Sequence, residues 1–167
     1  MRYKIVTISL LLLLFISCGK NYEKLSTAVS FAQQGMQNIQ SASDIALQIK
    51  ENIINGSKEI TAEEKEKLLN NYQNSLKLAH KNFQEALSIY KEINKEKPND
   101  AFVLNNLGHA YMWLNQKERA QDYFNQALKY CKPRGLRESI KLNMSYFPEV
   151  EKHYALFREI DKHFQEI

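Results

Sequence analysis

Apolar residues recur every three to four positions through nearly the whole chain, and this spacing constrains the fold more than any other feature. It places apolar side chains on one face of an α-helix, whereas a half-buried strand needs alternating apolar and polar residues, a pattern that is missing here. Glycine and proline, which interrupt helices, number only five and three among 167 residues. The sequence therefore predicts an all-α protein of one domain.

The first 17 residues differ from the rest and are predicted to be a secretion signal. Arg2 and Lys4 precede an apolar run of 12 residues from Ile5 to Ile16. That run is too short to cross a bilayer of about 30 Å as a helix, and charged residues follow it closely. The segment at its end, LFISCGK, resembles the lipobox of bacterial lipoproteins, in which a small residue precedes an invariant cysteine.

This resemblance implies that Cys18 receives a diacylglyceryl group and becomes the acylated N-terminus of the mature chain. Stable anchoring takes more than one acyl chain, which such processing supplies. The resemblance also implies a lipid-anchored protein of the bacterial cell envelope, on the periplasmic side of the outer membrane rather than at the inner membrane. The membrane would be contacted through this lipid alone, and no cofactor is expected. The alternative is an ordinary signal that is cut nearby, with Cys18 playing no part.

The charge of the mature chain is nearly balanced. Removing Arg2 and Lys4 leaves 21 basic residues against 19 acidic ones. This balance argues against binding to nucleic acid or to a membrane surface through charge. Once Cys18 carries lipid, Cys131 has no cysteine to pair with, so we expect it to pack as a small apolar side chain.

The mature chain is predicted to have a short tether at 18–24 and a single helical domain at 25–167. The predicted helices span residues 22 or 25 to 54, about 62–96, 101–114 and 118–132. The tail at 136–167 is predicted to hold two more, at about 136–144 and from about 148 onward. Thr61 and Glu64 form a capping box that starts the second segment, which is either one long helix or two. Asp100 is the expected N-cap of the third segment, and Pro148 suits the first turn of a last helix.

Segments 101–114 and 118–132 form a helical hairpin, because only three residues join them. A lone hairpin cannot bury both apolar faces, so it must stack on neighbours. Residues 101–134 resemble a tetratricopeptide repeat (TPR), a unit of about 34 residues. The positions that carry this resemblance are Leu104, Leu107, Gly108, Tyr111, Ala120, Phe124 and Ala127. A generic amphipathic hairpin is the alternative.

The preceding segment repeats the second half of this pattern. The matching positions are Ala79, Phe83, Ala86 and Leu87, spaced like Ala120, Phe124, Ala127 and Leu128. We therefore predict a degenerate repeat at about 62–98. Because about three repeats are needed for stability, segments 25–54 and 136–167 should act as caps. The expected fold is a short TPR-like solenoid of helical hairpins with about five or six helices.

Patterns typical of catalysis or metal binding are missing from the sequence. His80, His109, His153 and His163 lack the spacing of metal ligands. Glycine-rich phosphate loops and nucleophile motifs are absent as well. We expect no enzymatic activity and no bound metal.

In the TPR family the first helix of each repeat lines a concave groove. Carried over by position, this implies a partner-binding groove formed by Phe102, Asn105, His109, Met112 and Trp113. The resemblance implies a protein or peptide of the envelope as the partner. Two alternatives stay open. The C-terminal helix could cover this face, or the chain could be an accessory lipoprotein of a solute uptake system that holds a small ligand in an enclosed pocket.

Overall fold

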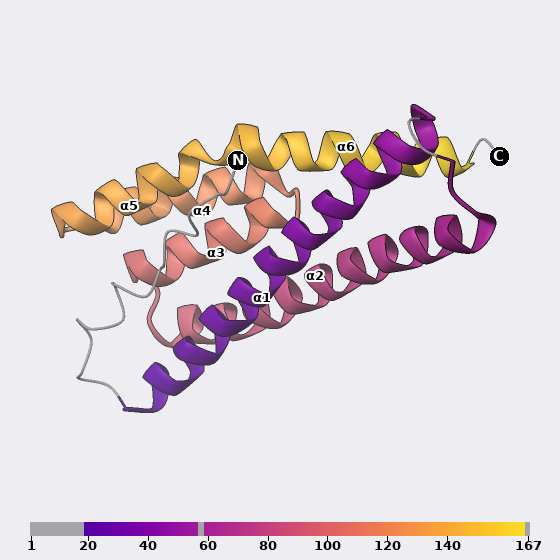
Figure 1. Ribbon diagram of the computed structural model, residues 1–167. Coiled ribbons are helices and arrows are strands. Elements are labelled where there is room, and N and C mark those ends of the chain that lie inside the picture. The colour runs from indigo at the N-terminus through magenta and orange to yellow at the C-terminus, as the bar shows by residue number, and fades with distance from the viewer. Residues whose placement is uncertain (1–18, 57–58, 166–167) are drawn as a thin grey trace.

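The computed structural model describes residues 19–56 and 59–165, and these residues form helices and no strand (Figure 1). The elements in chain order are α1 (Gly19–Ile49), the π-helix η3 (Lys50–Ile54), α2 (Ala62–Glu96), α3 (Ala101–Trp113), α4 (Lys117–Tyr130), α5 (Arg134–Ser145) and α6 (Phe147–Gln165). The predicted all-α, TPR-like solenoid is confirmed. The predicted signal at 1–17 and the predicted lipidation site at Cys18 lie outside the described residues.

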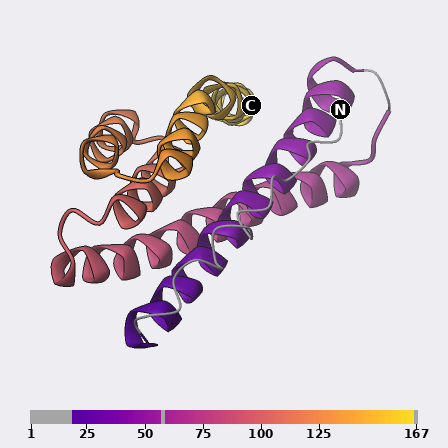
Figure 2. The same ribbon diagram turned by 90° about the vertical axis from the view of Figure 1, so that its left-hand side faces the viewer.

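Helices α1 and α2 form a long antiparallel hairpin (Figures 1 and 2). Helix α1 begins at Gly19 rather than near Leu25, so residues 19–24, predicted to be a tether, are helical instead. Helix α2 runs unbroken from Ala62 to Glu96, which makes this segment one helix.

The capping box that starts α2 is confirmed. The backbone N–H of Thr61 donates to Glu64 Oε2 at 2.9 Å, and the backbone N–H of Glu64 donates to Thr61 Oγ1 at 3.2 Å. These bonds satisfy two N–H groups that a helix start would otherwise leave without partners.

Helices α3 and α4 form the second hairpin, and its ends follow from local sequence. Asp100 caps α3 as predicted, because its Oδ1 accepts from the backbone N–H groups of Phe102 (2.9 Å) and Val103 (3.2 Å). Asn115 ends the helix with φ of 56°, a left-handed conformation that asparagine tolerates better than most residues. The chain then reverses within three residues into α4.

A glycine brings the two helices of each hairpin close together. A Cβ added at Gly108 of α3 would lie 2.8 Å from a ring carbon of Phe124 on α4. A Cβ added at Gly35 of α1 would lie 2.8 Å from a ring carbon of Phe83 on α2. The same glycine–phenylalanine contact therefore recurs in both hairpins. The repeat pattern in the sequence pairs Phe83 with Phe124. It does not indicate that Gly35 corresponds to Gly108.

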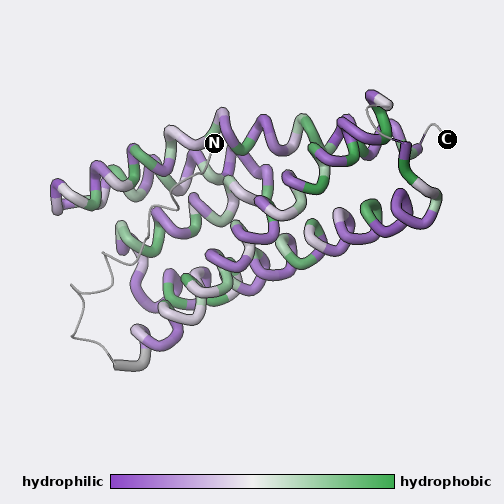
Figure 3. The backbone as a smooth tube through the Cα atoms, in the orientation of Figure 1, coloured by the Kyte–Doolittle hydropathy of each residue, from purple (hydrophilic) through white to green (hydrophobic). Residues whose placement is uncertain are grey.

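All seven residues that carry the resemblance to a tetratricopeptide repeat point inward. Those buried in the structure are Leu104, Leu107, Gly108, Tyr111, Ala120, Phe124 and Ala127. Along the helices, hydrophobic and hydrophilic segments alternate, as expected for elements with one buried face (Figure 3). Cys131 is also buried, so it packs as a small apolar side chain as expected.

Helices α5 and α6 decide how the solenoid ends. In Figures 1 and 2, α5 lies beside α3 and α4, and α6 continues from it toward the far end of α1. Helix α6 buries Val150, Phe157 and Ile160. Contacts to α2 fix its last half, because the Tyr72 ring packs on the Phe157 ring at 5.8 Å between centroids. The C-terminal helix thus packs back onto the first hairpin.

Candidate functional site

The five residues predicted to line a partner-binding groove lie on α3, but their side chains do not face an open groove. Asn105, His109 and Met112 have only 6%, 7% and 1% of their surface exposed. Phe102 and Trp113 are half-buried. Of the two arrangements that the sequence left open, the structure has the covered one: α5 and α6 contact this face of α3, and three of the five residues are buried.

Direct hydrogen bonds from α5 and α6 hold this cover in place. Tyr154 of α6 donates its hydroxyl hydrogen to the backbone carbonyl of Trp113 at 2.7 Å. Asn143 of α5 donates from Nδ2 to Asn105 Oδ1 at 3.0 Å. Burial raises the pKa of the Tyr154 hydroxyl to about 12, so this group stays protonated and able to donate. A partner could reach the buried α3 residues only if α6 moved away.

His109, which is buried, and Trp113, which is half-buried, lie one helical turn apart on α3. The indole Nε1–H of Trp113 donates to His109 Nε2 at 3.1 Å, and the indole ring stacks on Phe83 of α2 with centroids 6.4 Å apart. Burial lowers the pKa of His109 to about 4, because the charged imidazolium loses its hydration in the interior. The imidazole is therefore neutral at pH 7, and its Nε2 is free of a proton and able to accept the indole hydrogen bond.

His153 links α6 to α1 and α3 at the same junction. Its Nδ1 lies 2.6 Å from Ser43 Oγ of α1, and its ring lies 6.0 Å from the Trp113 ring. Burial lowers the pKa of His153, while the negative charges of Glu149 and Asp44 oppose that shift. His153 thus helps to hold α1, α3 and α6 together.

The described residues assemble no group suited to metal binding. Across 19–56 and 59–165, no three His, Cys, Asp or Glu residues gather where they could hold a metal ion. No helix in the same ranges is long and apolar enough to cross a membrane. The space beside α3, where an enclosed ligand pocket would lie, is occupied by side chains of α5 and α6. Nothing in this part of the chain favours the small-ligand alternative.

Sequence reasoning missed one surface, an uncharged face of α1. Residues 25–43 form 19 consecutive positions without a charged side chain, although a quarter of the whole chain is charged. The residues of this stretch that are exposed are Ser26, Thr27, Ser30, Gln34, Gln37, Gln40 and Ser41. The sequence does show this face, because no charged residue lies between Lys24 and Asp44. The apolar stripe of the same helix indicates only its buried face.

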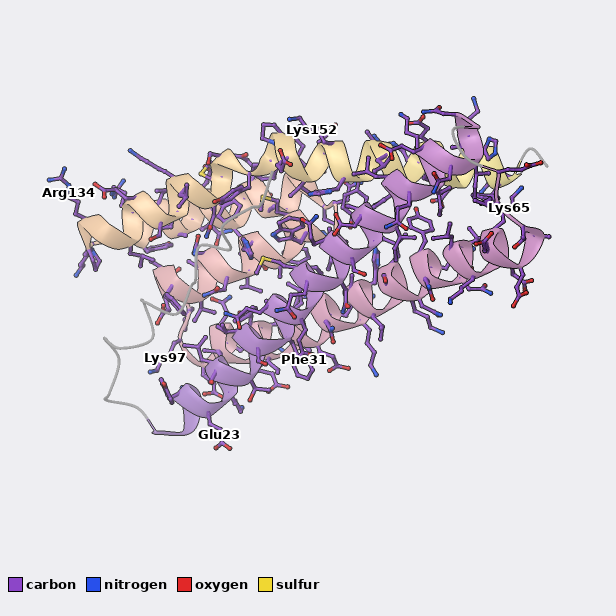
Figure 4. All side chains as sticks on the ribbon, in the orientation of Figure 1. Glu23, Phe31, Lys65, Lys97, Arg134 and Lys152 are labelled. Atoms are coloured by element: carbon purple, nitrogen blue, oxygen red, sulfur yellow. The ribbon has the colours of Figure 1, made fainter. Side chains whose placement is uncertain are left out.

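A shallow, open depression lies on this uncharged face beside one aromatic ring. Ser26, Thr27, Ser30, Phe31 and Gln34 line it, and Phe31 is half-buried there (Figure 4). Exposed helix faces of a protein this rich in charge normally carry lysine and glutamate. Their absence lowers the free-energy cost of removing water from this face, which is a property of interface centres.

Comparison with known proteins agrees with the helical hairpins. Residues 67–132 match the tetratricopeptide repeat family, and this range covers most of α2 together with α3 and α4. Searches of curated proteins and of solved structures find no match to the chain. The protein is therefore an all-α, TPR-like helical solenoid, and its residues 67–132 match a family of repeats that generally bind other proteins rather than catalyse reactions.

Proposed function

We propose that this chain is a lipid-anchored, non-catalytic TPR module that binds a protein partner in the bacterial cell envelope. The family match at residues 67–132 supports protein binding. The N-terminal sequence, with its short apolar run before Cys18, supports export and acylation. Two acyl chains or more would hold the mature chain on a membrane, the outer membrane rather than the inner where two exist.

The observation that carries the partner proposal is the uncharged exposed face of α1. Because the covered α3 residues are not accessible, we expect the partner to bind the exposed face of α1 instead. Burying an unpaired charge costs several kcal/mol, so a face without charges is cheaper to cover, provided that its hydroxyl and amide groups gain hydrogen bonds from the partner. By the same reasoning, the segment that covers it is an uncharged helix or peptide, with one apolar side chain that packs against Phe31 in this shallow depression.

The anchor has a direct test in living cells. Radiolabelled palmitate should be incorporated into the chain, and Cys18→Ala should abolish the labelling, because the thioether can form only on that sulfur. Gel autoradiography of the bacterial membrane fraction measures the palmitate incorporated into the chain. Cys131→Ala serves as the matched control and should leave the label intact, since Cys131 is buried. Label that persists in Cys18→Ala would remove the anchor from the proposal.

The partner surface has a test that separates binding from folding. A photo-crosslinker placed at Ser30 in the full chain should give one adduct of defined mass in the envelope. Adding Ser26→Glu and Gln34→Glu should weaken binding by about 2–5 kcal/mol, because two charges would be buried without partners, and the adduct should disappear. Circular dichroism should show unchanged helix content, since both positions are exposed.

The matched control places the same two charges on exposed positions of α2. Gln73→Glu and Gln84→Glu should leave the adduct at Ser30 unchanged, because neither residue lies on the uncharged face of α1. An adduct that survives the α1 charges, or that the α2 charges remove equally, would contradict binding at this face.

A further inference from the structure

Positive charge is concentrated in one short segment, although the mature chain is nearly neutral. Residues 129–141 carry five basic residues and one acidic residue, so their net charge of +4 leaves about −2 for the rest of the mature chain. The five exposed basic residues are Lys129, Lys132, Arg134, Arg137 and Lys141. The one acid, Glu138, binds Arg134 at 3.1 Å. The nearly equal numbers of basic and acidic residues in the mature chain argued against a charged membrane-binding surface, but those totals conceal the local excess of positive charge at 129–141.

This segment lies at the end of the molecule where α1 begins. It joins α4 to α5, and its turn lies on the same side as the α2–α3 turn and the first residues of α1 (Figures 1 and 2). Figure 4 places Arg134, Lys97 and Glu23 at this side of the molecule. We name Lys97, Lys132 and Arg134, the exposed basic residues of the two turns, the basic end.

Several acidic groups at this side of the molecule are already engaged. Lys24 lies 3.4 Å from both Glu92 and Glu96, and Asp100 accepts two backbone N–H bonds as the cap of α3. Arg137 fixes the shape of the α4–α5 turn, because its Nη2 donates to two backbone carbonyls at 3.0 and 3.2 Å. The positive charges of the basic end are therefore not neutralised by these acidic groups, and Arg137 holds the α4–α5 turn that carries two of them in a defined shape.

We propose that the basic end binds the anionic phospholipid headgroups of the membrane that holds the chain. This inference rests on the proposed acylation of Cys18. Because α1 begins at Gly19, one residue after Cys18, the anchor holds this side of the molecule close to the bilayer. Charges within a Debye length of about 8–10 Å interact with such a surface.

The test measures how close the α4–α5 turn comes to lipid headgroups. The full chain, purified from bacterial membranes, is reconstituted into vesicles of phosphatidylcholine alone or mixed with phosphatidylglycerol, each with a trace of nickel-chelating lipid. A nitroxide is attached at Gly135→Cys in a Cys131→Ser background. A side chain at Gly135 meets nothing within 4 Å, so the label should not disturb the fold. The control label sits at Ala62→Cys, the exposed first residue of α2.

Nickel should relax the label at position 135 several-fold more strongly in anionic vesicles than in neutral ones, and the label at position 62 equally in both. Each basic side chain near an anionic surface raises the fraction of molecules whose basic end contacts the headgroups by a factor of about five. Lys97→Gln, Lys132→Gln and Arg134→Gln together should therefore lower surface occupancy by more than about tenfold and abolish the difference. The matched control, Lys67→Gln, Lys77→Gln and Lys81→Gln, removes the same charge from exposed positions of α2 and should change nothing.

Flotation of the vesicles separates failure of this inference from failure of the anchor. If the chain does not float with either kind of vesicle, the proposed anchor is wrong and the orientation that rests on it falls too. If the chain floats but position 135 relaxes equally in both lipids, the anchor stands and the headgroup contact is overturned. Equal loss of the signal in both triple variants would also overturn it, because net charge rather than the basic end would then be responsible.

Discussion

Replacing Phe124 with alanine should lower the free energy of unfolding by about 3–5 kcal/mol. The ring is fully buried, packs directly on Gly108 of α3 and meets the Phe147 ring edge-on with centroids 5.9 Å apart. Truncation removes this packing and leaves a cavity that a rigid helical hairpin cannot close. Since a domain is stable by only about 5–15 kcal/mol, urea unfolding followed by circular dichroism should show a large shift of the midpoint.

Gly108→Ala gives the complementary measurement. In the native background it should cost about 1–3 kcal/mol, because the new Cβ would lie 2.8 Å from the Phe124 ring. In the Phe124→Ala background the same change should cost far less, since the ring has gone and alanine favours helix over glycine by about 1 kcal/mol. Simple additivity of the two changes would show that Gly108 and Phe124 do not form the close contact between α3 and α4.

Lowering the pH from 7 to 4 should destabilise the chain through His109 by roughly 3 kcal/mol. Burial lowers the pKa of His109 to about 4 in the folded state, whereas the ordinary value of 6.5 applies once the chain unfolds. Above pH 6.5 the imidazole is neutral in both states and contributes nothing to the pH dependence. Between pH 6.5 and 4 only the unfolded state binds the proton, so stability falls as the pH falls.

Urea unfolding at several pH values isolates this contribution when His109→Gln is compared with the native chain. Carboxylates also titrate below pH 5, but they do so in both proteins, so the difference between the two curves reports His109. That difference should shrink steadily between pH 6.5 and about 4, because the native chain alone loses stability through this residue. His80→Gln, at an exposed position of α2, controls for loss of an imidazole. Parallel curves for the native chain and His109→Gln would show that His109 is protonated in the folded state as readily as in the unfolded state.

Much of the helical framework could be read from the chain, because its signals are local. The capping box at Thr61 and the cap at Asp100 act within three residues, and both were predicted and found. The spacing of Gly108, Tyr111 and Phe124 indicated a hairpin because residues on one helix face must share an environment. The start of α1 was placed late, since residues 19–24 carry no apolar stripe to extend.

The candidate site could not be read in the same way. Phe102, Asn105, His109, Met112 and Trp113 occupy positions that line a groove when a repeat is followed by an open array. Whether they do so here depends on Tyr154 and His153, which lie about 40 residues further along the chain. A similar limit applied to the charge at the α4–α5 turn, because only the folded chain places this turn on the same side of the molecule as the start of α1 (Figure 1).

The sequence by itself determined that this protein is helical, where most of its helices begin and end, and that two of them pair around a small residue. Those properties arise from contacts between residues a few positions apart, which the spacing along the chain records directly. Only the tertiary structure decided that α6 covers α3, that His109 is buried and neutral, and which residues of the uncharged stretch of α1 stay exposed. These outcomes depend on which of several apolar faces pack together, and that choice is made by shape and by hydrogen bonds between distant segments.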